Sequence, residues 1–135
     1  MCKVGDIILV KKYKHDKMIL KQHSFIVVED TNGIINSMSY DFVSMVMGSY
    51  GQNDCKKEKK HGYDGNFPLA NEDTITNPDN GEDGYVKTDQ LYYFKKDQLE
   101  FRIMGTIAKD VLELIFEYVS DGKFPITTIT SNLEN

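Results

Sequence analysis

Residues 84–94 read Gly-Tyr-Val-Lys-Thr-Asp-Gln-Leu-Tyr-Tyr-Phe, and this stretch decides the fold that we expect. Apolar and aromatic residues that favour strands stand on both sides of a polar centre, which contains Lys87, Asp89 and Gln90. The pattern predicts a buried β-strand with a polar interruption in its middle. Burying Lys87 and Asp89 is costly unless they pair or serve a function, so both are candidate site residues. The alternative is an ordinary edge strand on which Lys87 and Asp89 are solvated.

The residues after this stretch predict a turn, a strand and a helix. Residues 95–98 are typical of a turn, and residues 99–103 alternate between apolar and polar as in a half-buried strand, which we expect to end at Gly105. An apolar stripe at helical spacing predicts a helix over residues 107–119, with Leu114 facing the core and Gly122 just past the end. Residues 123–135 show no period, so we expect a frayed tail.

The residues before this stretch predict three strands. Gly5-Asp6 indicates a turn, and the apolar run that follows predicts a first strand over residues 4–10. Residues 23–30 predict a second strand, and Asn32-Gly33 predicts a hairpin turn to a third strand over residues 33–38. Residues 11–22 are polar and rich in lysine, which favours a long loop.

The middle of the chain, about residues 39–65, combines a possible helix with a polar segment. Ser39 is a possible helix cap and Gly51 a possible stop, and the apolar residues between them recur at three- and four-residue steps. We therefore expect a short helix over residues 39–51. The lysine-rich residues 56–61 follow within a polar segment.

Composition limits the class of protein. The 135 residues suffice for one domain, which we place at residues 1–122. The net charge of −5 argues against a protein that holds long nucleic acid by bulk electrostatics. A short local RNA contact remains open, because lysines gather at residues 11–21 and again at residues 56–60. Solvated loops are the alternative interpretation of both groups.

The sequence shows no sign of export. No apolar run approaches the ~18 residues of a membrane span, and the first residues lack the apolar segment of a signal peptide. We expect a cytoplasmic protein in which Cys2 and Cys55 stay reduced. His15, His23 and His61 lack metal-binding spacing, so no metal site is expected.

The order of these features resembles the MazF/PemK family, the ribonuclease toxins of bacterial type II toxin–antitoxin pairs. The resemblance rests on the Asp-Gln-Leu strand at residues 89–91, a turn with Lys and Asp, a strand ending in Gly and an amphipathic helix. Gly5-Asp6 before an apolar strand and the strand from Phe25 extend it to roughly two-thirds of the chain. It implies a small, mainly β, SH3-like barrel with a C-terminal helix that forms a homodimer. Compact members of the family have little that corresponds to about residues 39–65, so the resemblance also implies an insertion there.

The resemblance also implies a function. Members of the family cleave single-stranded RNA without metal or other cofactor, through attack of the 2′-OH on phosphorus. Their partner is a small antitoxin protein whose disordered tail occupies the RNA groove. A binding module for RNA or protein on the same barrel, without catalysis, is the alternative function.

The main departure from the family is at residues 23 and 24. The family has Arg-Pro where this chain has His23-Ser24, and that Arg is a main catalytic residue there. The chemistry needs a group that titrates near neutrality and a fixed positive charge. We expect His23 to be the acid or base, because histidine changes charge near pH ~6.5, Lys87 to supply the charge, and Asp89 to orient or accept a proton. A weak or inactive site, or a structural His23, is the alternative. The RNA-binding residues that we expect are Lys21, Gln22, Ser24, Asn66, Phe67 and Gln90.

Overall fold

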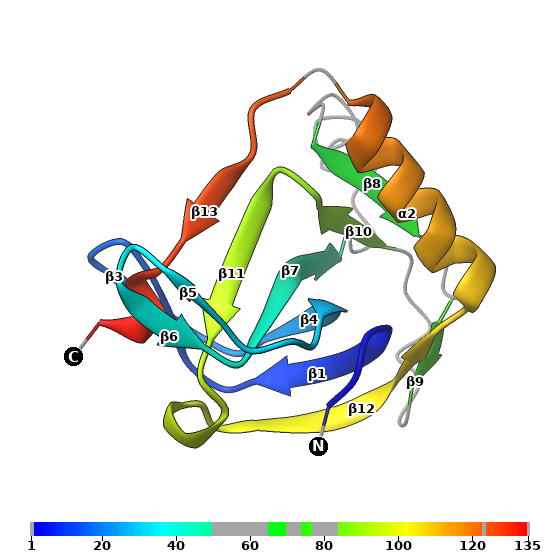
Figure 1. Cartoon of the computed structure of the whole chain (residues 1–135). Helices are drawn as coiled ribbons and strands as arrows, with labels where there is room; N and C mark the ends of the chain where they lie inside the picture. The colour runs from blue at the N-terminus through cyan, green and yellow to red at the C-terminus, as the bar shows by residue number, and fades with distance from the viewer. Residues whose placement is uncertain (1, 50–64, 70–73, 77–83, 123, 135) are drawn as a thin grey trace.

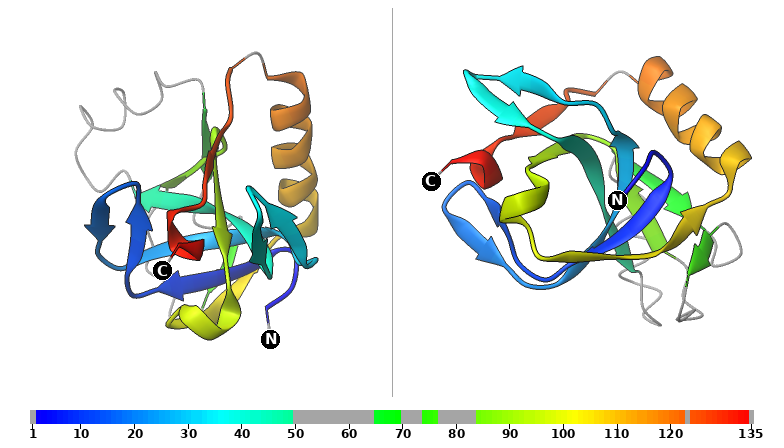
Figure 2. Two further views of the ribbon diagram at one scale, coloured as in Figure 1. Left: turned by 60° about the vertical axis from the view of Figure 1, so that its left-hand side comes forward. Right: turned by 60° about the horizontal axis from the view of Figure 1, so that its bottom comes forward.

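The computed structural model describes residues 2–49, 65–69, 74–76, 84–122 and 124–134. Over these residues the protein is mainly β with mostly antiparallel pairing, and helix α2 (Lys109–Asp121) lies late in the chain, between β12 and β13. The sheet curls around its own core, and α2 lies along one side of it (Figure 1; Figure 2). This confirms the predicted fold class at the level of antiparallel β-structure with a late helix. Within the described ranges the strand order is an open path and does not close into a ring.

Strand pairing joins residues from both ends of the chain. The main path runs through β13 (Thr127–Ile129), β11 (Gln90–Phe94), β7 (Phe42–Ser49), β4 (His23–Glu29), β1 (Asp6–Val10), β12 (Phe101–Ile107) and β9 (Thr74–Thr76). β10 (Gly84–Lys87) pairs with β7 and with β8 (Asn66–Leu69). Two hairpins stand beside this sheet, β2 (Tyr13–His15) with β3 (Met18–Leu20), and β5 (Gly33–Ile35) with β6 (Met38–Tyr40). Two 3₁₀ helices, η2 (Lys96–Gln98) and η3 (Ser131–Leu133), complete the described elements.

The polar interruption predicted within residues 84–94 is present. β10 and β11 both pair with β7, one after the other. Val86 pairs with Met47 and Tyr92 pairs with Ser44, so six steps along residues 86–92 correspond to only three steps along β7. The surplus residues loop out around Thr88, which is fully buried. The Thr88 amide and hydroxyl donate to the Gly65 carbonyl at 2.7 and 2.6 Å, so the interruption is satisfied by hydrogen bonds.

The helix predicted over residues 39–51 is wrong, because Phe42–Ser49 form the central strand β7. The strand pairs with β4 on one side and with β10 and β11 on the other. Phe42 and Val43 point to opposite faces and are both buried, so this apolar run covers two cores and shows no alternation. The insertion predicted over about residues 39–65 therefore begins inside the fold. Residues 56–61 and Cys55 lie outside the described ranges.

Two predictions about turns are also wrong. Residues 11–22 contain the β2–β3 hairpin, whose turn holds Asp16 at a φ of 56°. The turn at Asn32-Gly33 does not join two paired strands; the β5–β6 hairpin turns instead at Asn36 and Ser37, with φ of 50° and 65°. Small polar residues tolerate these positive φ values, and three-residue strands are too short to show a hydrophobic period.

The C-terminal residues are packed into the fold, so the frayed tail predicted over residues 123–135 is wrong. β13 runs parallel to β11 and places Ile129 in the core, where it is 2% exposed. Leu133 of η3 is also buried. Burial of these two side chains explains why a segment without a period is ordered.

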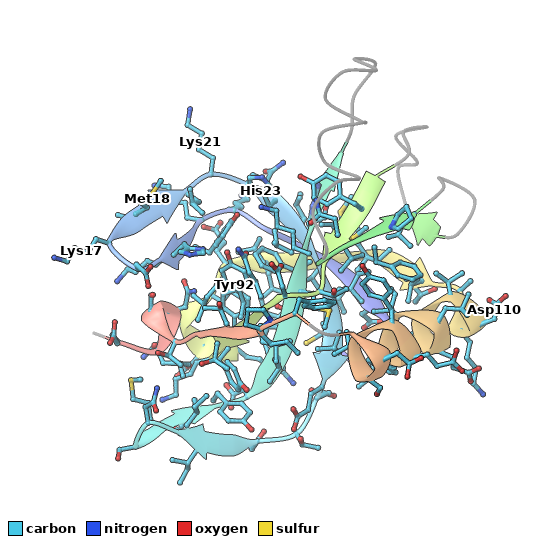
Figure 3. All side chains as sticks on the ribbon, turned by 90° about the horizontal axis from the view of Figure 1, so that it is seen from above. Lys17, Met18, Lys21, His23, Tyr92 and Asp110 are labelled. Atoms are coloured by element: carbon cyan, nitrogen blue, oxygen red, sulfur yellow. The ribbon has the colours of Figure 1, made fainter. Side chains whose placement is uncertain are left out.

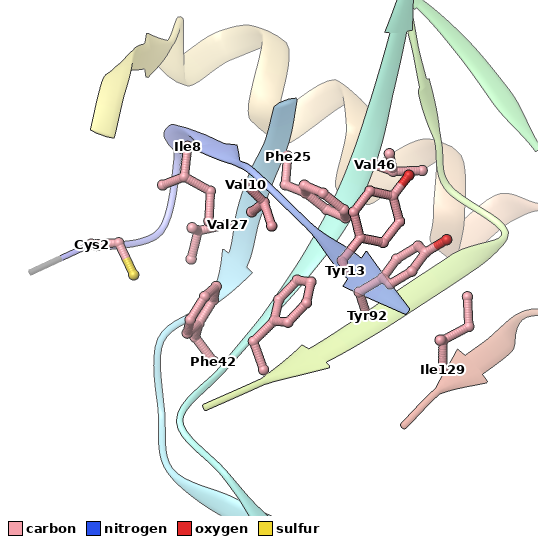
Figure 4. Close-up of a cluster of buried hydrophobic side chains, with 11 residues drawn as sticks. Cys2, Ile8, Val10, Tyr13, Phe25, Val27, Phe42, Val46, Tyr92 and Ile129 are labelled. Atoms are coloured by element: carbon pink, nitrogen blue, oxygen red, sulfur yellow. The ribbon is translucent and has the colours of Figure 1, made fainter. Parts of the chain in front are cut away.

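The sheet has two covered faces, and strand alternation assigns residues to each. We call the face that carries Phe25 the inner face and the face that carries Ile26 the helix face. The inner face is covered by the cluster Cys2, Ile8, Val10, Tyr13, Phe25, Val27, Phe42, Val46, Tyr92, Phe94 and Ile129 (Figure 4). The helix face packs against α2 through Ile7, Ile26, Met45, Leu69, Val86, Ile107, Val111, Leu112 and Ile115.

The helix residue that anchors α2 is Ile115 and not Leu114, which corrects the orientation expected from the apolar stripe. Ile115 is 0% exposed, whereas Leu114 is 52% exposed. We predict that Ile115→Ala lowers the free energy of unfolding by about 2–5 kcal/mol and that Leu114→Ala lowers it by less than about 1 kcal/mol. Urea unfolding of the two variants tests this, because each serves as the control for the other. Equal losses would contradict the orientation of the helix.

Candidate functional site

His23 stands at the entrance of β4 with its side chain on the inner face. It pairs with Val10 of β1, and it is two residues from Phe25, so the two side chains share a face. The imidazole is exposed, and its Nδ1 lies 3.2 Å from the Tyr13 hydroxyl and 3.1 Å from the Lys21 carbonyl oxygen. A carbonyl oxygen only accepts, so the tautomer that satisfies Lys21 carries its proton on Nδ1. Nε2 is then the basic nitrogen in the neutral ring.

His15 reaches the same end of the inner face from the β2–β3 hairpin. Its Nδ1 lies 2.9 Å from the Tyr92 hydroxyl, and that hydroxyl lies 3.4 Å from Gln90 Oε1. A hydroxyl has one hydrogen, so all three groups are satisfied when His15 Nδ1–H donates to Tyr92 and Tyr92 donates to Gln90. His15 Nε2 lies 3.9 Å from Asp16 Oδ2, which makes an ion pair when the ring is protonated.

Two buried tyrosines join the two histidines. The rings of Tyr13 and Tyr92 meet edge to face with centroids 5.4 Å apart, and Tyr13 meets the His23 ring in the same way at 5.7 Å. Burial, with a smaller effect from the charge of Tyr85, raises the pKa of Tyr13 to about 12. Burial, then the charges of Tyr13 and Asp16, raises the pKa of Tyr92 well above its usual range. Both hydroxyls therefore remain protonated near neutral pH, and they lie on the same side of the cluster, away from Cys2 (Figure 4).

Lys87 lies on the same face as His23, with β7 between them. Phe25 of β4 pairs with Val46 of β7. Because the two strands are antiparallel, the same register places His23 opposite Gly48. Gly48 pairs with Tyr85, and a Cβ on Gly48 would overlap the Tyr85 ring, so this ring fills the space above the glycine. Lys87 is two residues after Tyr85 and points to the same face. Since β4 and β10 are two strand spacings apart, about 10 Å of sheet separates their backbones.

The other predicted residues divide between the two faces. Asn66 is buried on β8, pairs with Lys87 and shares its face. Phe67 points to the helix face, where its ring meets Tyr118 of α2 edge to face at 5.4 Å. Asp89 lies in the interruption, and its carboxyl group packs so closely on Gly65 that a Cβ there would overlap it. The structure therefore places Phe67 away from His23.

The remaining predicted residues lie beside His23 in the chain. Lys21 and Gln22 are exposed between β3 and β4, and Ser24, which pairs with Leu9, points to the face opposite His23. Lys17, Met18 and Lys21 follow the outer edge of the hairpin, whereas Tyr92 lies deeper in the molecule (Figure 3). Residues 11–21 contain five lysines and one aspartate, on a chain whose net charge is −5. The candidate site is therefore next to the most basic described segment.

The sequence analysis missed His15, Tyr13 and Tyr92 as site residues. Residues 11–22 were expected to form a loop, and in a loop the spacing between Tyr13 and His15 carries no meaning. If residues 13–15 are taken as a strand, Tyr13 and His15 point to the same face. The same two-residue spacing places the side chains of Gln90 and Tyr92 on one face of their strand. That alternation was the available signal.

Comparison with known proteins returns no relatives: no protein family, no curated protein and no solved structure matches this chain. Among the residues that the structure describes, no group of three His, Cys, Asp or Glu side chains is arranged to hold a metal ion. The described helices include none that is long and apolar enough to cross a membrane. The arrangement holds two imidazoles by their Nδ1 atoms, at the Lys21 carbonyl and the Tyr92 hydroxyl, and leaves both Nε2 atoms as the groups that could act as acid or base.

The raised pKa of Tyr13 predicts how stability changes at high pH. An unfolded tyrosine ionises near pH ~10, whereas folded Tyr13 holds its proton until about pH 12. Between these values the unfolded state releases a proton that the folded state keeps, so stability is lost as pH rises. We predict a loss of about 1 kcal/mol from Tyr13 by pH 11, which is absent in Tyr13→Phe. Urea unfolding at pH 8 to 11 tests this, and parallel pH curves for the two proteins would contradict it.

Proposed function

We propose that this protein is a metal-independent endoribonuclease that cleaves single-stranded RNA, a MazF/PemK-like toxin of a type II toxin–antitoxin pair on an SH3-like barrel. The observation that carries the proposal is the pair of imidazoles, His15 and His23, held by Nδ1 at one polar end of the inner face. RNA cleavage through the 2′-OH needs one base and one acid, and two imidazoles can fill these two roles.

The roles follow from the surroundings of each ring. His23 is exposed and its Nδ1 donates to a carbonyl, so its Nε2 is assigned to take the proton of the 2′-OH. The alkoxide then forms a bond to phosphorus while the bond from phosphorus to the 5′-oxygen breaks. His15 forms its ion pair with Asp16 only when protonated, so it is assigned to give a proton to the leaving oxygen. The products are a 2′,3′-cyclic phosphate and a 5′-OH.

The developing charge on phosphorus needs a cation, and Lys87 is the candidate on the same face. Its ammonium acts as a point charge and does not bind phosphate bidentately, as the family's Arg does. Lys17 and Lys21 are exposed on the hairpin side and suit the flanking phosphates. Asp89 is a third residue to test by substitution, because its carboxyl group lies at the strand interruption.

A second candidate function is a binding module that has lost catalysis. It is favoured by the contacts of His23, which among the described residues join it to Tyr13 and Lys21 and not to Lys87 or Asp89. A site in which the lysine ammonium lies far from the catalytic base can bind a phosphate but cleaves RNA slowly, because stabilisation of the transition state requires both groups close to the reacting phosphorus.

The proposal includes partners and place. A small antitoxin with an acidic, disordered tail suits the basic hairpin, and the protein acts in the cytoplasm as a two-fold symmetric homodimer. Light scattering at high protein concentration tests the last point. The proposal expects twice the chain mass of 15.5 kDa, and the mass of a single chain would contradict it.

The catalytic assignment is tested by incubating the purified protein with mixed single-stranded RNA in EDTA. We predict cleavage without divalent ions, ends that carry a 2′,3′-cyclic phosphate, and activity that changes between roughly pH 5 and 8. His23→Ala and His15→Ala should each lower kcat by about 10²–10⁴-fold, the usual contribution of a general acid or base. Lys87→Ala should lower kcat more than it raises KM, because its charge acts on the phosphorane.

Asn32→Ala is the control, since Asn32 is exposed and lies outside the residues assigned to catalysis or RNA binding. Equal cleavage by wild type and His23→Ala would remove His23 from the mechanism. RNA binding by all variants with cleavage by none, over a broad set of sequences, would favour the binding module over the enzyme.

A further inference from the structure

The C-terminal segment is anchored to the strand that carries the inner part of the site. We call residues 127–133, which comprise β13 and η3, the C-terminal clamp. β13 pairs with β11 so that Thr127 stands beside Gln90 and Ile129 beside Tyr92. The Thr127 amide donates to the Asp89 carbonyl at 2.8 Å, and Ile129 and Leu133 are buried. The clamp is therefore fixed on its inner side by strand pairing and by apolar packing.

The outer side of the clamp holds β2 on both sides of His15. The Asn132 carboxamide accepts from the Lys14 amide at 2.7 Å and donates to the Lys14 carbonyl at 2.9 Å. Its oxygen and nitrogen bond the backbone as a neighbouring strand would, so a side chain completes the free edge of the hairpin. On the other side of His15, the Asp16 amide donates to Ser131 Oγ at 2.9 Å.

These bonds matter because no backbone pairing between described strands joins the hairpin to the main sheet, and side chains such as Tyr13 make the other contacts. Within the described ranges β2 pairs with β3 alone, and together they form a separate two-stranded sheet. Asp16, next to His15, has a φ of 56°, which places the turn of the hairpin in the left-handed region.

We propose that Asn132 and Ser131 are positioning residues, which hold β2 so that His15 Nδ1 meets the Tyr92 hydroxyl. The clamp therefore contacts both partners of the His15–Tyr92 hydrogen bond: it pairs with β11, which carries Tyr92, and it bonds the backbone on both sides of His15. The consequence for catalysis rests on the proposed function: the clamp sets the geometry of the proton donor and leaves His23, on β4, in place.

The inference is tested first without RNA, by hydrogen exchange and by the nitrogen spectrum of the histidines. In Asn132→Ala we expect the Lys14 amide to exchange at least about tenfold faster, because it loses its acceptor. We also expect His15 to lose the single Nδ1–H tautomer that the bond to Tyr92 selects, while His23 keeps its tautomer. The Ile26 amide in the middle of the sheet should exchange at the wild-type rate, which shows that the fold is intact.

Two variants frame this measurement. Asn132→Asp keeps the acceptor for the Lys14 amide and loses the donor, so it should protect that amide better than Asn132→Ala does. Asn32→Ala is the control, since Asn32 is exposed and lies outside the clamp and the hairpin. An unchanged tautomer of His15 in Asn132→Ala and in Ser131→Ala would overturn the inference.

The RNA assay separates this inference from the proposed function. If both stand, Asn132→Ala should lower kcat about tenfold with little change in KM, and Asn132→Asp should recover part of the loss. If the His15 tautomer is lost in Asn132→Ala but wild-type protein cleaves no RNA, the clamp is supported and the proposed function fails. If wild type cleaves RNA and Asn132→Ala is unchanged in both kcat and tautomer, the clamp is contradicted and the function stands.

Discussion

The two hydrogen bonds from Thr88 to the Gly65 carbonyl are the constraint on which the rest of the structure depends. They satisfy a buried threonine at the point where β10 gives way to β11, and without them a polar backbone would be buried unpaired. The interruption lets one stretch of chain pair twice with β7 out of register. β10 then continues the sheet to β8, and β11 continues it to β13. Lys87 stands on one side of the break, and Gln90 and Tyr92 stand on the other.

The candidate site follows from this division. β11 carries Tyr92 to the hairpin and to the C-terminal clamp, while β10 pairs with the same edge of β7 nearer its C-terminal end and carries Lys87. Tyr13 and Tyr92 have their rings in the core and their hydroxyls at its polar end, so an apolar cluster also orients two exposed or half-exposed imidazoles. The same burial that raises the pKa of both phenols keeps them protonated as hydrogen-bonding groups. The two imidazoles of this cluster are its candidate acid and base groups.

The sequence predicted those parts of the fold that have a long pattern. The alternation after residue 99 and the helical stripe after residue 107 were sufficient, because each runs for more than one repeat of its period. The prediction was wrong for β7, because its apolar residues, buried on both faces of the sheet, recur at three- and four-residue steps as in a helix. The three-residue strands β2, β3 and β13 were not predicted. These short strands depend on distant partners, such as Asn132 for Lys14, which no local pattern reveals. His23 and Gln90 were found from a resemblance, whereas His15 was missed because its strand was missed.

The central claim is that His15 and His23 belong to one site that receives a single RNA strand. The most direct test follows the ring signals of both histidines by NMR while a single-stranded oligonucleotide with 2′-O-methyl groups, which cannot be cleaved, is added. The account predicts that both signals move together and saturate at the same oligonucleotide concentration. Movement of one of the two without the other, or of neither at saturating oligonucleotide, would contradict the shared site.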